Sequence, residues 1–318
     1  MATIPLTVFT STFNRSELLS RTYESLCFQT FRDFEWLIID DGSSDDTAER
    51  VRGWQATAPF SIRYIYQRNA GKHRTHNRAI ALASGELFAV LDSDDTLVPQ
   101  AIERLLFHWN SIPGPDRDRF SGITCLCMDE RCELVGSTFP SQVVDCRHYE
   151  LETIHGVTGE KWGCHRTSVL RQFEFPEIPG EKYCPEGIVW NRIARSYLMR
   201  HVNEPLRIYY RHSGSMTAWP AGTLMNNPRY ARLYYRECLD LPAGSSWRYK
   251  RTINYVRYSL HAGVPLWDAL SDSPGLLLTV AAAPVAFARY LCDVWQRKDS
   301  AVPKNPMGRP LTGDRSAF

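Results

Sequence analysis

The stretch GELFAVLDSDD, residues 85–95, decides how the rest of the chain is interpreted. Residues 86–91 are an expected strand, and residues 35–39 form a short continuous apolar one, as expected where helices cover both faces of a parallel sheet. Asp92, Asp94 and Asp95 directly follow residues 86–91. Three carboxylates within four residues repel one another, so this turn predicts a compensating cation. Oxygen ligands at such spacing suit Mg²⁺ or Mn²⁺.

Strand-like and helix-like segments alternate on the N-terminal side of this stretch. The expected strands are residues 4–10, 35–39, 62–66 and 86–91. The expected helices are one capped by Ser16 with Leu18, Leu19, Leu26 and Cys27 facing inward, one from Ser43 or Ser44 to Gln55, and one from Thr75 to Ala83. This order predicts an α/β fold, a doubly wound domain with a mostly parallel sheet.

A second acidic pair, Asp40-Asp41, directly follows the expected strand at 35–39. Ligands of open α/β sheets bind at the carboxyl ends of the strands, so both clusters are expected at one edge, where a cation between them would grip a diphosphate. The alternative for Asp92–Asp95 is an Asx-turn and helix cap ahead of Pro99, the expected first residue of the next helix. The second cluster at the same edge favours a ligand site.

The segments after Pro99 are less regular. A helix follows that proline, and the Pro- and Gly-containing residues 111–116 indicate a break between two halves of one unit. Residues 123–210 carry irregular strands and an expected helix at 186–197, and the chain beyond Ser215 is helical and aromatic.

Composition excludes some classes of protein. The chain has 318 residues and a formal charge of +2, which argues against a dedicated nucleic-acid binder. Nine cysteines occur without a Cys-x-x-Cys pair, so zinc on Cys125, Cys127 and Cys132 has weak support. Reduced, mostly buried thiols in the cytosol are the simpler interpretation.

The sequence also bears on membrane insertion. Residues 1–5 do not begin a secretory signal, because no basic region precedes an apolar stretch. The uncharged run at 273–288 is interrupted by Pro284 and is expected to be too short for a spanning helix of roughly twenty residues.

Several motifs occur in a fixed order along the first half of the chain. They are LTVFTSTFNR at 6–15, QTF at 29–31, LIIDDGSSDDT at 37–47, NAGK at 69–72 followed by Asn77, and GELFAVLDSDD at 85–95. In order and spacing they resemble family 2 glycosyltransferases of the GT-A fold. The resemblance covers residues 4–110 strongly and 155–217 more loosely. It implies an inverting hexosyl- or related transferase of surface polysaccharide or glycoconjugate synthesis.

The resemblance assigns roles around the nucleotide-sugar. Ser11, Phe13 and Asp41 would bind the nucleotide, and Phe13 stands where the family often has Tyr, which keeps stacking but loses a hydroxyl. The Asp-Ser-Asp-Asp run resembles the family's DXD motif, with Asp92 on ribose or sugar. Asp94 and Asp95 would be metal-side ligands for Mg²⁺ or Mn²⁺.

Gly71 and Lys72 are expected to contact phosphate or donor. Glycine permits close backbone approach, and a helix begins nearby. They belong to a basic stretch for which a solvated helix face is the alternative; its members are Arg63, Arg68, Lys72, His73, Arg74, His76 and Arg78.

An inverting transfer needs one carboxylate to deprotonate the acceptor hydroxyl, because the leaving group is already a phosphate. The resemblance points to Glu186 as this catalytic base, with Glu181 as the second choice. Pro185-Glu186-Gly187 departs from the family's usual Glu-Asp pair, and the alternative for Glu186 is a favourable interaction with a helix dipole. Residues 159–162 could line the acceptor side.

The loop at 210–217 resembles the family's loop that closes the donor site. Arg211 could meet the pyrophosphate and His212 could contact metal or phosphate, although a lone His in a polar loop is often only solvated.

The resemblance also suggests how the chain is organised. Residues 1–217 would form the catalytic domain, with a nucleotide-sugar half at 1–110 and an acceptor half at 111–217. Residues 218–318 would form a helical extension. From Trp247 to Tyr258 aromatic and basic residues alternate ahead of the apolar run, so these helices either pack on the domain or lie in a bilayer interface.

The expected partners are a nucleotide-sugar donor, a UDP-sugar first, and a saccharide or lipid-linked acceptor. The expected location is the cytoplasm, with possible peripheral contact with the cytoplasmic face of a membrane. A sugar nucleotidyltransferase is disfavoured because the first loop lacks a glycine-rich cradle, and a dinucleotide oxidoreductase because no G-x-G-x-x-G follows the first strand. A catalytically silent sugar-nucleotide-binding protein is the non-enzyme alternative.

Overall fold

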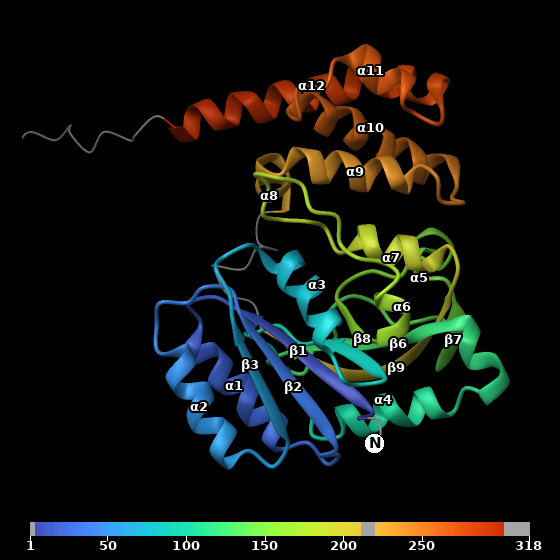
Figure 1. Cartoon of the computed structure of the whole chain (residues 1–318). Coiled ribbons are helices and arrows are strands. Elements are labelled where there is room, and N and C mark those ends of the chain that lie inside the picture. The colour runs from blue at the N-terminus through green and yellow to red at the C-terminus, as the bar shows by residue number, and fades with distance from the viewer. Residues whose placement is uncertain (1–3, 211–219, 302–318) are drawn as a thin grey trace, which may run out of the picture.

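The computed structural model describes residues 4–210 and 220–301. In this part of the chain a nine-stranded mixed sheet has helices on both faces, and further helices stack at one end of the molecule (Figure 1). The expectation of a doubly wound, mostly parallel α/β domain with a helical extension is confirmed.

The first half forms the parallel part of the sheet. Its elements are β1 (Leu6–Thr12), α1 (Ser16–Cys27), β2 (Phe34–Asp40), α2 (Thr47–Thr57), β3 (Ser61–Tyr66), α3 (Lys72–Leu82) and β4 (Leu87–Val90). The strands lie in the order β3-β2-β1-β4, all parallel, with Val8 opposite both Trp36 and Ala89. A change of strand order on either side of β1 is the feature that opens a ligand crevice in such sheets.

The second half adds mainly antiparallel pairs. Its elements are β5 (Thr96–Leu97), α4 (Ala101–Asn110), the 3₁₀ helix η1 (Gly114–Arg119), β6 (Phe120–Asp129), β7 (Val143–Cys146), α5 (His148–Thr153), β8 (Lys161–Arg166), α6 (Thr167–Leu170), α7 (Gly187–Ala194) and β9 (Leu198–Tyr209). β8 pairs antiparallel with β4 and β6, and β9 runs parallel to β6. β5 and β7 both pair antiparallel with β9, so β9 links the acidic turn before β5 to the second half.

The sheet separates two apolar cores, because successive side chains of a strand point to opposite faces. Val8 and Trp36 pack under α1, α2 and α4. Phe9 and Leu37 pack under α3, α6 and α7. Every residue of β2 is buried, which explains the continuous apolar run from Trp36 to Ile39.

Helix boundaries differ from the expected ones where a neighbouring loop supplies the cap. Ser16 is the first residue of α1 rather than its cap, and its N–H donates to Asp45 Oδ2 at 3.1 Å. Asp45 Oδ1 also accepts from the Thr47 N–H at 3.2 Å, so α2 begins at Thr47 and not at Ser43 or Ser44. The Asp45 carboxylate therefore fixes the N-terminal ends of both α1 and α2.

Three other boundaries shift by a few residues. α3 begins at Lys72, three residues before the expected Thr75. α4 begins at Ala101, so Pro99 precedes the helix, and α7 covers only Gly187–Ala194 of the expected 186–197.

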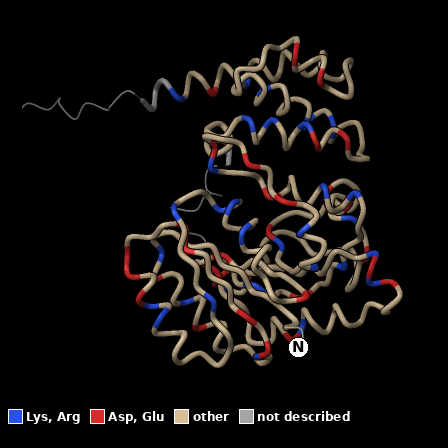
Figure 2. Tube along the Cα trace, in the orientation of Figure 1, with Lys and Arg blue, Asp and Glu red and all other residues tan. Residues whose placement is uncertain are grey.

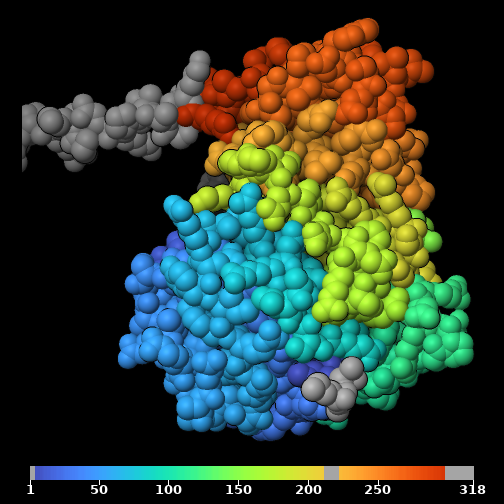
Figure 3. Space-filling view, viewed as in Figure 1, coloured from blue at the N-terminus to red at the C-terminus, as the bar shows by residue number. Residues whose placement is uncertain are grey.

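The helical extension comprises α8 (Pro220–Asn226), α9 (Pro228–Cys238), α10 (Ser245–His261), α11 (Leu266–Ser271) and α12 (Leu276–Ala301). It stacks on the α3 and α7 side of the sheet domain (Figures 1 and 3). The Tyr230 hydroxyl is fully buried there and donates to the Pro176 carbonyl at 2.9 Å. Arg192 of α7 binds both carboxylate oxygens of Glu237.

The expectation that the apolar run is too short to span a membrane is corrected. α12 continues past the charged residues that end the run, and Leu276–Arg297, 22 residues, is long and apolar enough to cross by length and composition. Of the window that meets this test, 22% is buried inside the structure.

Candidate active site

The carboxyl ends of β1, β2 and β4 bring the two acidic clusters to one edge of the sheet. Asp40 ends β2 and is buried, with its carboxylate accepting from the Ser43 N–H at 2.7 Å and the Tyr64 hydroxyl at 2.6 Å. The first aspartate of the pair therefore holds its own loop.

Asp41 holds the loop that precedes α3. Oδ1 accepts from the Gln67 amide at 2.8 Å and from the Ala70 N–H at 2.9 Å, while Oδ2 accepts from the Gly71 N–H at 2.8 Å. The side chain is only 4% exposed. Contact between this carboxylate and a nucleotide stays a prediction, and the observed bonds give Asp41 the shaping of the Gln67–Gly71 loop.

The loop after β1 is tied to the loop after β2. Asn14, with φ +50°, donates its N–H to Ser43 Oγ at 2.8 Å and accepts the Ser44 N–H at 2.7 Å. Ser11 lies at the end of β1 with its hydroxyl 2.9 Å from Thr75 Oγ1. The neighbouring Phe13 ring is 46% exposed, which leaves an aromatic face open beside these loops.

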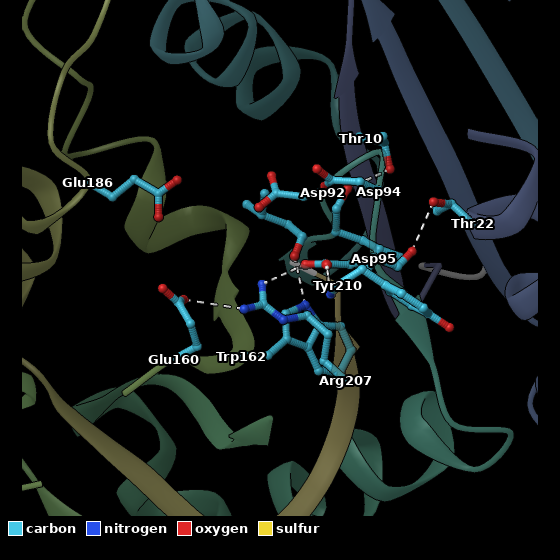
Figure 4. A network of polar contacts seen from close by, with 12 residues as sticks. Thr10, Thr22, Asp92, Asp94, Asp95, Glu160, Trp162, Glu186, Arg207 and Tyr210 are labelled. Carbon is cyan, nitrogen blue, oxygen red and sulfur yellow. Dashed lines mark hydrogen bonds and ion pairs between the residues drawn. The ribbon is translucent and has the colours of Figure 1, made fainter. Parts of the chain in front are cut away.

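Asp92, Asp94 and Asp95 converge in the turn after β4 (Figure 4). One ligand oxygen from each lies within 4.8 Å of the others. Within residues 4–210 and 220–301 this is the one group of at least three His, Cys, Asp or Glu side chains close enough to hold a metal ion. Cys125, Cys127 and Cys132 form no such group.

Helix α1 clamps this turn from one side. Arg15 Nη1 lies 3.0 Å from Asp94 Oδ2, and Arg21 donates to the Asp94 carbonyl at 2.7 Å. The Thr22 hydroxyl donates to the Asp95 carbonyl at 2.9 Å. The turn is thus preorganised by residues far away in sequence.

Arg207 of β9 is a site residue that the sequence interpretation missed. Its guanidinium is nearly buried and lies 3.4 Å from Asp95 Oδ2 and 3.3 Å from Glu160 Oε2, so it joins the acidic turn to the start of β8 (Figure 4). The available signal was a charged residue between Leu206 and Ile208 in an otherwise apolar strand.

The electrostatics of the turn favour a cation. Burial, with the charges of Asp92 and Asp94, raises the pKa of Asp95 to about 7 despite the opposing effect of Arg207. Asp95 Oδ2 is buried and accepts no hydrogen bond from the described residues. A buried carboxylate oxygen that accepts no hydrogen bond and has only the Arg207 ion pair, in a cluster of three acids, matches the donor set of Mg²⁺ or Mn²⁺.

Lys72 connects the turn to the opposite wall. Its Nζ lies 2.6 Å from Asp92 Oδ1 and 3.0 Å from Glu186 Oε1. Burial disfavours the ammonium, but the two carboxylates outweigh it and raise the pKa of Lys72. Burial likewise opposes ionisation of Asp92, and Lys72 overcomes this and lowers the pKa of Asp92.

A pocket of about 120 Å³ lies between these groups. Lys72, Asp92 and Glu186 line its polar side. Its interior is lined by side chains from β4, β6, β8, β9, α5, α6 and α7, among them Phe88, Val90, Thr124, His148, Lys161, Trp162, His165, Leu170, Trp190, Met199 and Arg207. The expected acceptor-side segment contributes Lys161 and Trp162 directly, while Glu160 contacts Arg207.

Other predicted residues have structural partners. Glu181 is 6% exposed and accepts the N–H groups of Arg229 and Tyr230, so the second choice for a base caps helix α9. Gly71 adopts φ +101°, and an added Cβ would lie 2.8 Å from the Lys182 carbonyl oxygen. The backbone of Gly71 thus lies close to the loop that contains Lys182, and contact of Gly71 with phosphate stays a prediction. Arg211 and His212 lie outside the described residues.

Comparison with known proteins gives a family match in the first half of the chain. The model described as "Glycosyl transferase family 2" matches residues 7–114. The uncharacterized glycosyltransferase YibD of Escherichia coli is 33% identical over 234 residues, 68% of this chain and 64% of that protein. The GalNAc(5)-diNAcBac-PP-undecaprenol beta-1,3-glucosyltransferase of Campylobacter jejuni is 37% identical over 210 residues, 64% of each. This chain spans less than two thirds of either relative.

Solved structures share the fold at low sequence identity. Staphylococcus aureus TarS 1–349 aligns with a TM-score of 0.60 at 15% identity, covering 92% of both chains. Its complex with UDP-GlcNAc gives 0.58 at 17% identity, covering 94% of this chain and 84% of that one. The mannosyltransferase PcManGT of Pyrobaculum calidifontis with GDP-Man and Mn²⁺ gives 0.52 at 17% identity, covering 94% and 81%. The GT-A fold is confirmed.

Proposed function

Because this chain belongs to glycosyl transferase family 2 through residues 7–114, we propose that it is a metal-dependent, inverting glycosyltransferase that moves a sugar from a nucleotide-sugar to an acceptor hydroxyl. The observation that carries the proposal is the carboxylate turn at Asp92–Asp95 facing Glu186 across a pocket, with Lys72 between them.

Donor binding follows from the groups at the sheet edge. Asp94 and Asp95 would hold Mg²⁺ or Mn²⁺, which neutralises charge on the diphosphate leaving group when bound. Asp92 faces the ribose or sugar. The exposed Phe13 ring offers a stacking surface for the base, and Asp41 shapes the adjoining loop. The UDP-GlcNAc complex of TarS makes a UDP-sugar the first donor to test.

Glu186 is the proposed base. Its carboxylate takes the proton of the acceptor hydroxyl as that oxygen attacks the anomeric carbon, and the bond from this carbon to the diphosphate oxygen breaks. A general acid is unnecessary because the diphosphate leaves as an anion. Glu186 directly precedes α7, and its side chain is about half exposed at the pocket, so an acceptor can reach it.

Lys72 controls when this base is free. Without ligand its ammonium is shared between Asp92 and Glu186. A donor diphosphate beside Asp92 offers Lys72 an anionic partner of higher charge than Glu186. Moving this contact to the donor leaves the Glu186 carboxylate able to accept a proton only once donor is bound.

The acceptor is proposed to be a saccharide or a lipid-linked saccharide. Trp162 and Trp190 line the pocket, the first buried and the second stacked on His165, so they form a rigid wall on the acceptor side. The Campylobacter relative is named for an undecaprenol-linked acceptor, which supports the lipid-linked class and a location at the cytoplasmic face of a membrane.

Thermal unfolding with UDP, GDP and dTDP, each with and without Mn²⁺, tests donor binding. A ligand that binds only the folded state at 100 times its Kd raises the free energy of unfolding by about 2.7 kcal/mol. We expect one nucleotide to stabilise the protein only when metal is present. Absence of stabilisation by every nucleotide and metal contradicts the proposal.

A catalytically silent sugar-nucleotide-binding protein is the second candidate. The Pro185-Glu186-Gly187 departure and the ion pair that neutralises Glu186 favour it. Release of nucleotide from the donor that binds best, with and without added saccharide acceptors, separates the two. Binding without turnover of any donor supports the silent protein.

A further inference from the structure

The outer surface of α11 and α12 is apolar where a helix on a water-soluble domain is usually polar. Trp267 of α11 is 76% exposed, and Leu277 and Trp295 of α12 are 86% and 65% exposed. The other large apolar residues exposed on these two helices are Leu266, Leu276, Val280, Val285, Phe287 and Leu291. In Figure 2 the first part of α12 carries no charge, in agreement with the sequence from Leu276 to Ala288.

The inner face of α12 carries small and polar side chains. Thr279 and Asp293 are buried against the other helices, together with the small residues Ala282 and Ala286. Asp293 accepts two hydrogen bonds of 2.6 Å from Arg257 and lies 2.8 Å from His261 Nε2. The large apolar side chains of α12 thus lie outward, whereas an amphipathic helix usually packs them on a core. The outer face is therefore adapted to apolar surroundings.

Charge is divided unevenly along the chain. Residues 218–318 contain 13 Lys and Arg against 7 Asp and Glu, a formal charge of +6, whereas residues 1–217 contain 24 against 28, a charge of −4. Arg289 and Arg297 are exposed on α12 beside the apolar face. Lys304, Arg309 and Arg315 follow in the sequence beyond the described residues.

We propose that the outer face of α11 and α12 binds the surface of an anionic lipid bilayer, with α12 lying in the interface plane. Exposed apolar and aromatic side chains beside bases are the composition of interfacial helices. A hollow of about 440 Å³ at one end of this face is lined by Arg248 and Leu276–Leu278, so a basic group adjoins the apolar surface.

The contacts of Asp293 indicate that α12 lies in the plane of the bilayer surface and does not span it. A spanning α12 would leave α10, separate Asp293 from Arg257 and carry the charges of Arg289 and Asp293 into the span, which is costly. Binding in the plane keeps this ion pair and submerges only side chains that are already exposed. A second copy of the chain fits less well, because two extensions of charge +6 would face each other.

Cosedimentation of the full-length protein with vesicles tests the proposal, in the absence of donor so that the outcome is independent of transferase activity. The vesicles are phosphatidylcholine alone or with one third phosphatidylglycerol. We expect at least tenfold stronger binding to the anionic vesicles, and release in 0.5 M NaCl because surface charges are then screened.

The double variant Leu277→Glu/Trp295→Glu should bind anionic vesicles at least tenfold more weakly. Phe28→Glu is the matched control, since Phe28 is 72% exposed on the sheet domain, and its binding should match the wild type. Trp267→Ser, on the separate helix α11, should weaken binding about threefold. Circular dichroism checks that each variant is folded.

Three outcomes overturn the proposal. Equal vesicle binding by the double variant assigns binding to another surface. A dimer that the double variant dissociates, without vesicle binding by the wild type, identifies a second copy as the partner. Vesicle-bound protein that resists alkaline carbonate extraction indicates a spanning helix.

Discussion

The two sides of the pocket are built differently. On the donor side the chemistry resides in contiguous motifs, and the family match stops at residue 114. On the opposite side Glu160, Glu186 and Arg207 come from three separate elements and meet only through the sheet. In the proposed function, donor recognition is thus a local property of the sequence, whereas the proposed acceptor side depends on tertiary assembly.

Removing the carboxylates of the donor side should have the largest effect. We expect Asp94→Asn/Asp95→Asn to lower transferase kcat/KM by about 10³-fold or more, because charge on the leaving diphosphate loses its stabilisation. Donor-induced thermal stabilisation should also lose its dependence on Mn²⁺. The control Asp118→Asn changes a carboxylate of η1 away from the pocket and should leave both readouts intact. Unchanged metal dependence in the double variant contradicts the ligand assignment.

Removing the base tests the assembled side. Glu186→Gln should lower kcat by about 10²- to 10⁴-fold while donor affinity changes little, because a positioned base acts only on the acceptor proton. Glu181→Gln is the comparison, since Glu181 caps α9 and should affect stability more than kcat. Normal turnover by the Glu186 variant would falsify this assignment.

Arg207 joins the two sides, and its removal should reduce stability. Arg207→Leu leaves Asp95 buried without its cation, so the variant should lose unfolding free energy relative to the wild type mainly above pH 7, where the Asp95 carboxyl ionises. Adding Asp95→Asn should recover part of this loss in urea denaturation without metal. If the losses of unfolding free energy from the two substitutions simply add in the double variant, Arg207 and Asp95 are not directly coupled.

The smallest effect concerns His76 of α3, which lies where the first-half core meets α7. Its ring contacts Phe88, Phe175 and Trp190 at centroid distances of 5.4, 4.8 and 6.1 Å, and burial lowers its pKa to about 3. In the unfolded state His76 therefore binds a proton near pH 6.5, whereas in the folded state it stays neutral. Protonation of His76 on unfolding should therefore contribute about 1.4 kcal/mol to the loss of unfolding free energy from pH 7.5 to 5.5, beside the contributions of other buried histidines.

Replacement of this ring isolates its contribution. His76→Phe should flatten the pH dependence by that amount, whereas the exposed His155→Gln should not. Equal slopes for the wild type and both variants would assign the pH dependence to other groups.

Features formed by contiguous motifs could be predicted from the sequence, whereas features assembled through the sheet could not. Asp92, Asp94 and Asp95 could be grouped because they are adjacent and follow an apolar strand, and the parallel order followed from alternation of periods. Arg207 could not be assigned, because its proximity to Asp95 depends on the pairing of β9 with β5. The start of α1 was predicted wrongly because its cap is Asp45, which is distant in sequence from this helix. Long-range partners leave no local pattern.

The ion pair between Asp293 and Arg257 limits how the protein can be shortened. Arg257 is 14% exposed, and its only described carboxylate partner sits near the end of the last helix. A truncation that stops before Asp293 strands a guanidinium inside α10, so shortened versions for crystallisation should either keep the chain through Arg297 or remove α10 as well.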